Sequence, residues 1–369
     1  MLKNFAFFLL FFGAAACVEP YNFVIRDDER SLVVEAFLSD KSYSETLTYP
    51  SDGRYFSVKL SRTSDVINVR SEPIAYAAVE LQSDLGDTWE YTESPAVAGL
   101  YELLNDDFKA QQGIRYRLRI QLSDDEIYES AWESLPAIEP PPMGIIGFEE
   151  TVIRKYAIEA NEEVVVSVKA IETRIEIPEN NTNSPLYYRW TYMPHWIYIA
   201  PLSPSVILPG HTCWITTPHY LRNYSIQKDF VGGYTKGLFF METVRNDRIF
   251  EKFSALIVQY AMTEPYYNFW SEMREQNQEA SIVDKPPFNL ATNFHSLNSD
   301  LRVAGYFGVV NEQATRWYFT KKDLSYAVEN TLKEDCLASY GGPPAPECFD
   351  CRQYSRADAT NVKPSWWQD

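Results

Sequence analysis

The residues best able to do chemistry in this chain are its five cysteines and four histidines. The C-terminal segment CLASYGGPPAPECFDC holds Cys348 and Cys351 in a C-x-x-C pattern, with Cys336 upstream. That spacing is compatible with a zinc knuckle, a redox dithiol or a disulfide-linked tail. A redox centre is disfavoured because no βαβ pattern surrounds the motif. Whether the motif binds zinc or forms disulfides depends on the compartment in which the protein folds.

A second group of metal-ligating types is the H-x-C-x5-H of His211, Cys213 and His219. Imidazole and thiolate are ligands that suit transition metals. Zinc sites usually space their ligands two to four residues apart on each side, and Pro218 indicates a loop. We therefore expect no metal here.

Carboxylate pairs and nucleotide motifs are the remaining sources of chemistry. The sequence contains no Walker loop, G-x-S-x-G elbow, G-x-G-x-x-G or H-E-x-x-H. The acidic doublets at 106–107 and 124–125 fall between expected strands, where Asp is favoured for local hydrogen bonds in turns. We expect no catalytic residues, no cofactor and no enzymatic activity.

The N-terminus, MLKNFAFFLLFFGAAAC, answers the question of the compartment. Lys3 precedes a short apolar run at 5–12, and three alanines lead directly into Cys17. The run is too short to span a bilayer but suits a signal peptide. We predict a lipoprotein signal peptide at 1–16 and an acylated Cys17 that begins a tether at 17–30. A cleaved secretory signal with an incidental cysteine is the alternative.

Export places the four other cysteines in an oxidising environment. An even number of them favours two disulfides among Cys213, Cys336, Cys348 and Cys351 over a zinc site. Three pairings are open. One arrangement ties the tail to Cys213 on the body and closes a small loop between two of the other three.

Composition and periodicity indicate an all-β protein. The 369 residues are 45% hydrophobic and 15% aromatic, and the net charge of -18 excludes nucleic acid and anionic lipid as partners. Over 31–135, strands such as RYRLRIQL alternate apolar and polar residues, which predicts an immunoglobulin- or transthyretin-like β-sandwich. The Pro-rich stretch at 136–144 predicts a linker. Residues 145–369 are expected to form a larger β-rich domain with a disulfide-linked tail.

Two aromatic segments stand out in this second domain. TEPYYNFWSEMREQNQE predicts a helix with Thr263 as N-cap and an apolar stripe. YYRWTYMPHWIYI concentrates rings that we expect to pair across strands inside a sheet. The alternative is that Trp190, Trp196 and Tyr198 lie exposed as a platform for a sugar or a protein partner.

These segments, in their order, resemble a known family. LVVEAFLSD, AVELQSDLGDTWEYTE, GIRYRLRIQLSDDEIYES, the YYRWTY strand, EPYYNFWSEM, VAGYFGVV and ECFDC…VKPSWW follow one another after Cys17. The chain is similar to the "domain of unknown function 4249" lipoproteins of Bacteroidetes-type bacteria. The resemblance covers nearly the whole sequence and brings no catalytic residues.

The resemblance implies an outer-membrane lipoprotein that works as a non-enzymatic accessory or binding subunit beside a TonB-dependent receptor in nutrient uptake. A glycan or a peptide is the expected ligand. Surface display is expected, with periplasmic orientation as the alternative, because the acidic residues after Cys17 are sparse: Glu19 early, then Asp27, Asp28 and Glu29. A free-standing carbohydrate-binding or adhesion lipoprotein is the second hypothesis.

Overall fold

The computed structural model describes residues 31–49, 51–62, 72–159, 162–221, 223–278, 291–299, 303–338 and 342–368. The predicted signal peptide, the tether and Cys17 lie outside the described residues. The expected all-β fold is confirmed, because strands dominate the described chain. None of the described helices combines the length and apolar character needed to cross a membrane.

The largest sheet runs in the order β20-β14-β13-β17-β19-β1-β2-β7-β6, with β15 paired to β13 and β3 paired to β2. Its strands are β1 (Leu32–Ser39), β2 (Phe56–Arg62), β3 (Glu72–Pro73), β6 (Thr92–Glu93), β7 (Leu100–Leu103), β13 (Leu186–Ile199), β14 (Thr212–Thr216), β15 (Ser225–Asp229), β17 (Lys252–Ala261), β19 (Val303–Thr320) and β20 (Asp358–Thr360).

Two smaller sheets complete the β structure. One contains β4 (Ala78–Ser83), β5 (Thr88–Glu90), β8 (Arg115–Gln121), β9 (Ile127–Ser130), β10 (Glu133–Ser134) and β18 (Phe294–Ser296). The other is three-stranded and contains β11 (Ile146–Glu159), β12 (Glu162–Ile177) and β16 (Tyr234–Glu242). The helices are α2 (Tyr43–Thr46), α3 (Glu264–Gln278), α4 (Leu332–Leu337) and the 3-10 turns η2 (Asp247–Ile249), η3 (Lys321–Asp323), η4 (Pro346–Cys348) and η5 (Cys351–Gln353).

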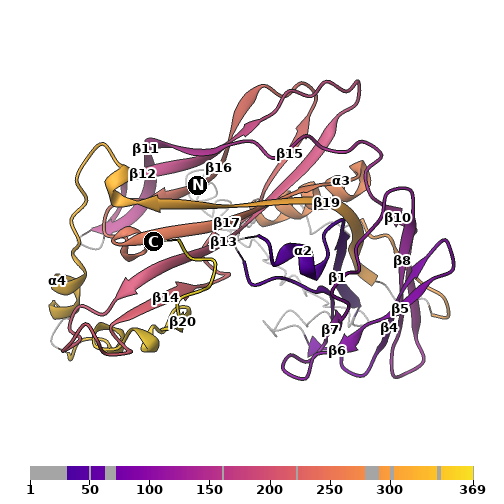
Figure 1. The fold of residues 1–369 in the computed structure, drawn as a ribbon, viewed down its shortest axis with the longest axis horizontal. Helices are drawn as coiled ribbons and strands as arrows, with labels where there is room; N and C mark the ends of the chain where they lie inside the picture. Colours follow the sequence, from indigo (N-terminus) through magenta and orange to yellow (C-terminus); the bar gives the residue numbers. More distant parts are fainter. Residues whose placement is uncertain are drawn as a thin grey trace, which may run out of the picture. The chain divides into compact units, whose positions relative to one another are not determined.

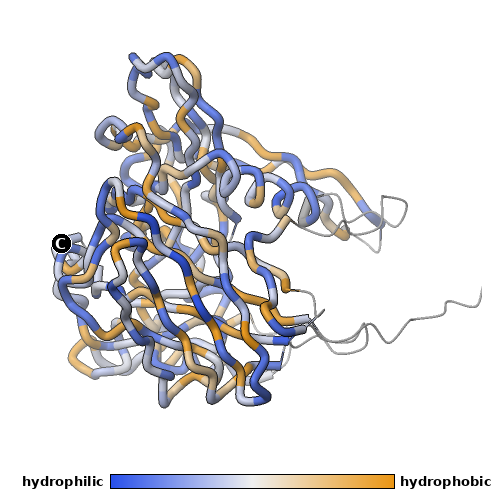
Figure 2. Tube along the Cα trace, turned by 90° about the vertical axis from the view of Figure 1, so that its right-hand side faces the viewer, coloured by the Kyte–Doolittle hydropathy of each residue, from blue (hydrophilic) through white to orange (hydrophobic). Residues whose placement is uncertain are grey.

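The first hydrophobic core lies between the six-stranded sheet and the β1-β2-β7 part of the large sheet. In β8, Tyr116, Leu118 and Ile120 are buried, as the period-two pattern predicts. Figure 2 turns the side with β4, β5 and β8 to the viewer and shows hydrophobic and hydrophilic residues alternating along these strands. Phe294 and Phe307, from beyond the Pro-rich stretch, also belong to this core.

Strand β19 connects the two halves of the chain. It pairs in parallel with β1 through its first residues and antiparallel with β17 through its later ones, and Figure 1 shows it as a long arrow between them. Gly305 has φ +107°, and a Cβ there would lie 1.9 Å from the Val34 carbonyl oxygen. Only glycine fits this point. Residues 31–369 form one compact unit, and the predicted domain boundaries stay a prediction.

The second core packs one face of β13, β17 and β19 against β12, β16 and the C-terminal tail. Two disulfides hold that tail. Cys213 in β14 bonds Cys351 across 138 residues, and Cys336 bonds Cys348 across 12 residues. The prediction of two disulfides, one of them joining the tail to Cys213, is confirmed.

Candidate functional site

Helix α3 covers the opposite face of the large sheet and forms one wall of a cleft. The helix is the one that the EPYYNFWSEM segment predicts, and its buried residues Tyr266 and Phe269 pack with Tyr306 of β19. A Cβ on Gly308 would come within 2.3 Å of the Tyr266 ring, so glycine at this position permits the close approach of helix to sheet. The Tyr224 hydroxyl donates a 2.8 Å hydrogen bond to the Trp270 carbonyl and fixes the middle of the helix.

The cleft lies between α3 and strands β1, β2 and β19 and has a volume of about 570 Å³. This size is within the range of about 300–1,000 Å³ that is typical of small-molecule sites. Most of its lining is apolar or aromatic, and the main contributors are Val33, Phe37, Phe269, Trp270, Met273 and Ala304. Its charged lining residues are Glu35, Lys59 and Arg189.

Arg189 is the unusual member of this lining. It lies on β13, its side chain is only 8% exposed, and its guanidinium carbon is 3.7 Å from the centre of the Trp270 ring. The rings of Tyr260 and Tyr224 lie 5.0 Å and 5.8 Å from the same carbon. Burial raises the pKa of Tyr224 to about 12, while the positive charges of Arg189 and Arg274 oppose that rise. The guanidinium is therefore held in an aromatic cage.

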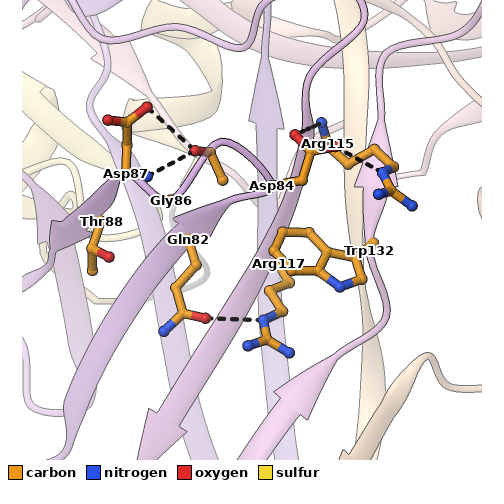
Figure 3. A pocket seen from close by; sticks show the side chains of 9 residues that line it. Gln82, Asp84, Gly86, Asp87, Thr88, Arg115, Arg117 and Trp132 are labelled. Carbon is orange, nitrogen blue, oxygen red and sulfur yellow. Dashed lines mark hydrogen bonds and ion pairs between the residues drawn. The ribbon is translucent and has the colours of Figure 1, made fainter.

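A second, more polar pocket of about 480 Å³ lies on the six-stranded sheet and is shown in Figure 3. Its charged groups already have hydrogen-bond partners in the protein. Arg115 donates to Asp84 at 2.9 Å, which lowers the pKa of that carboxyl, and Arg117 donates to Gln82 at 2.9 Å. Arg117 also lies 4.7 Å from the centre of the Trp132 ring and covers it.

The two pockets differ in what they leave for a ligand. In the polar pocket the arginines already have acceptors, and a ligand would have to displace them. In the cleft under α3 the walls are apolar, and Arg189 has no carboxylate partner in the described part of the chain. An apolar pocket with a few convergent polar groups is the usual form of a binding site. The cleft is therefore the candidate functional site.

The alternative interpretation of β13, an exposed aromatic platform, is wrong. Trp190 and Trp196 are 0% exposed and Tyr198 is 2% exposed, so none of the three can contact a ligand from solvent. They point into the second core because β13 lies between β17 and the strands β14 and β15, with tail and sheet covering that face. The other interpretation of this segment, pairing inside the sheet, is the one that the structure bears out.

His195 of the same strand is also largely enclosed. Its ring lies 4.8 Å from that of Trp366 and its Nδ1 is 3.4 Å from a guanidinium nitrogen of Arg316. Burial, and secondarily the charge of Arg316, lowers the pKa of His195 to about 4. The imidazole is consequently neutral at physiological pH.

The other residues singled out in the sequence have local roles. Cys213 is in a disulfide, so the H-x-C-x5-H cluster has no thiolate to offer a metal. The described residues contain no group of three or more His, Cys, Asp or Glu side chains placed around a metal position. The acidic doublets lie in turns, where Asp106 accepts from Tyr55 and Asp124 pairs with Arg62.

Sequence analysis did not identify Arg189. It stands between Tyr188 and Trp190, on the face of β13 opposite to those two rings. A cation within a run of aromatic residues was the available signal. Its significance depends on the cover that α3 provides, which no pattern within β13 could show.

These features define an all-β protein with an apolar, arginine-containing cleft beneath helix α3. The chain belongs to the family described as domain of unknown function DUF4249, whose model matches residues 18–316. No curated protein and no solved structure matches the chain.

Proposed function

We propose that this chain is an outer-membrane lipoprotein, anchored through Cys17, that works as a non-enzymatic accessory subunit beside a TonB-dependent receptor in nutrient uptake. Surface display is the orientation that we propose. The two disulfides support an oxidising compartment, since such bonds persist outside the cytoplasm.

The main structural support for the proposed role as a partner subunit is the hairpin of β11 and β12. Strand β16 pairs with β12 only from residue 170 onward, so the outer half of the hairpin is a two-stranded ribbon. Tyr156 and Ile158 lie on one face of β11 together with Val165, which is paired with Tyr156, and Val152 lies on the same face beyond Arg154. The four apolar side chains are exposed.

An exposed apolar face of this kind favours a protein partner. In water, an isolated two-stranded ribbon is at best marginally stable. An exposed apolar patch usually marks a site of interaction. The outer edge of β11 also pairs with no other strand in the described residues, and an open edge can accept a strand from another protein. Both features suit a permanent contact with a larger membrane protein.

Affinity purification from the native membrane tests the proposal. The full chain with a C-terminal tag is expected to recover a TonB-dependent receptor, and Tyr156→Ser with Ile158→Ser is expected to reduce that recovery strongly. Tyr76→Ser removes an equally exposed ring elsewhere and serves as the matched control. Absence of a receptor from the wild-type eluate would contradict the proposed role, and full recovery with the double variant would contradict the proposed surface.

A further inference from the structure

Arg189 is largely buried, and no carboxylate of the described residues pairs with it. A guanidinium carries five N–H donors at its edge and none on its faces. Three aromatic rings lie close to the guanidinium carbon, and Nε is buried without a hydrogen-bond acceptor. The indole Nε1 of Trp270 is likewise buried without an acceptor. A buried charge that lacks a partner destabilises the fold, and a bound anion would relieve that cost.

Two other arginines that the structure describes, both partly enclosed, have carboxylate partners. Arg54 pairs with Glu312, whose side chain is almost completely buried, and Arg117 pairs with Glu129 at 2.6 Å. Glu35, the one carboxylate among the described residues that line the cleft, is bonded to Lys59 at 3.1 Å. With that pair neutralised, Arg189 gives the cleft a net positive charge.

We propose that the cleft under α3 binds a small molecule that carries a carboxylate on an apolar body, with the carboxylate on the edge of Arg189. Arg forms charge-assisted, often bidentate hydrogen bonds to carboxylates. The apolar walls formed by Phe37, Phe269 and Met273 cover the rest of the ligand. An uncharged glycan would leave the guanidinium without a counter-ion.

Two sources supply this chemistry: the free C-terminus of a short apolar peptide and a fatty acid. The inference rests on the proposed function, because it names the nutrient class that an accessory subunit would capture. Receptor recovery by the hairpin and ligand binding by the cleft nevertheless involve different residues. Arg189→Gln is therefore expected to recover the receptor like the wild type, so either idea can fail separately.

Isothermal titration calorimetry tests the inference on the full chain made with Cys17→Ser, which is purified without lipid or detergent. The probes are two matched pairs: N-acetyl-Leu-Phe with its amide, and decanoate with decanamide. We expect the acid of one pair to bind at least about tenfold more tightly than its amide, as charge-assisted hydrogen bonds imply. The pair that shows the difference identifies the source.

Substitutions assign the effect to Arg189. Arg189→Gln is expected to weaken binding of the acid to the level of the amide while the amide is unaffected. Arg189→Lys keeps the charge but loses the bidentate geometry of the guanidinium, so we expect intermediate affinity for the acid. Arg117→Gln, an arginine of the polar pocket, should bind both probes as the wild type does. Near-UV circular dichroism checks that each variant is folded.

The inference is overturned if acid and amide bind the unmodified cleft equally, or if neither acid binds at about 1 mM, where even weak sites are partly filled. This comparison needs no variant and holds if Arg189→Gln does not fold. Unchanged acid binding by a folded Arg189→Gln protein would also overturn it.

Discussion

Removal of the Cys213–Cys351 disulfide is expected to destabilise the protein more than removal of Cys336–Cys348. The first bond closes a segment of 138 residues and the second a segment of 12. In the chain-entropy description, a cross-link stabilises by restricting the unfolded chain, and the effect grows with the logarithm of the loop length. Applied separately, it gives about 5 kcal/mol for the longer loop and about 3 kcal/mol for the shorter one.

Equilibrium unfolding in urea measures the difference. Each pair of cysteines is replaced by serine. The free energy of unfolding is then obtained under non-reducing conditions, together with the slope of its dependence on urea concentration. We expect the Cys213→Ser, Cys351→Ser protein to lose about 2 kcal/mol more than its counterpart. Both sulfurs of the longer bond are fully buried, so serine adds to its loss. Equal losses, or a larger loss for the shorter loop, would refute the reasoning.

Three further predictions concern packing and charge. Gly308→Ala is expected to cost about 1–3 kcal/mol, because its Cβ overlaps the Tyr266 ring of α3, whereas Gly147→Ala, which has open space, should be nearly neutral by thermal denaturation. Glu312→Gln removes the buried partner of an arginine and should cost about 3 kcal/mol in urea unfolding, against less than about 1 kcal/mol for Glu35→Gln, whose pair is exposed. The fold favours the neutral form of His195. The free energy of unfolding should therefore fall by about 2–3 kcal/mol through this residue as pH falls from 6.5 toward about 4.

The controls make these three outcomes decisive. For His195, urea unfolding at pH 7 and pH 4.5 is compared with that of His195→Asn. The wild type should lose more stability than the variant over this interval, because its unfolded state binds a proton that the native state excludes. Parallel pH profiles would contradict the assignment, as would equal costs for the two glycine substitutions or for the two glutamate substitutions.

Local patterns predicted the individual elements well. The alternation in RYRLRIQL became β8 with its apolar side chains in the core, and the aromatic stripe of EPYYNFWSEM became α3. Each depends on periodicity within one segment, which the sequence contains completely. The even cysteine count likewise predicted two disulfides, although the particular pairing required the fold.

Contacts between distant segments could not be predicted in this way. The parallel pairing of β1 with β19 joins Leu32 to Val303, and β18 reaches back to β9 of the sandwich. No periodicity within either strand specifies the other. The same limitation left the exposed platform open as an alternative for Trp190 and Trp196, since burial of a strand's two faces depends on which elements cover them.

Every wall of the cleft depends on such long-range contacts. Arg189 on β13, Trp270 on α3 and Phe37 on β1 come from three regions of the chain. Their meeting follows from the order of strands in the large sheet and from the glycine that admits α3. From the sequence, Arg189 is one cation in an aromatic strand; in the structure it is a buried charge facing an apolar cleft.

The proposed role of this chain depends on its export and lipid anchoring, which mass spectrometry of the protein extracted from native membranes measures directly. The N-terminal peptide is expected to begin at Cys17 and to carry acyl chains, in a protein with four oxidised cysteines. Recovery of residues 1–16 still attached to an unmodified Cys17, in a chain with free thiols, would contradict the proposed location and with it the role beside a TonB-dependent receptor.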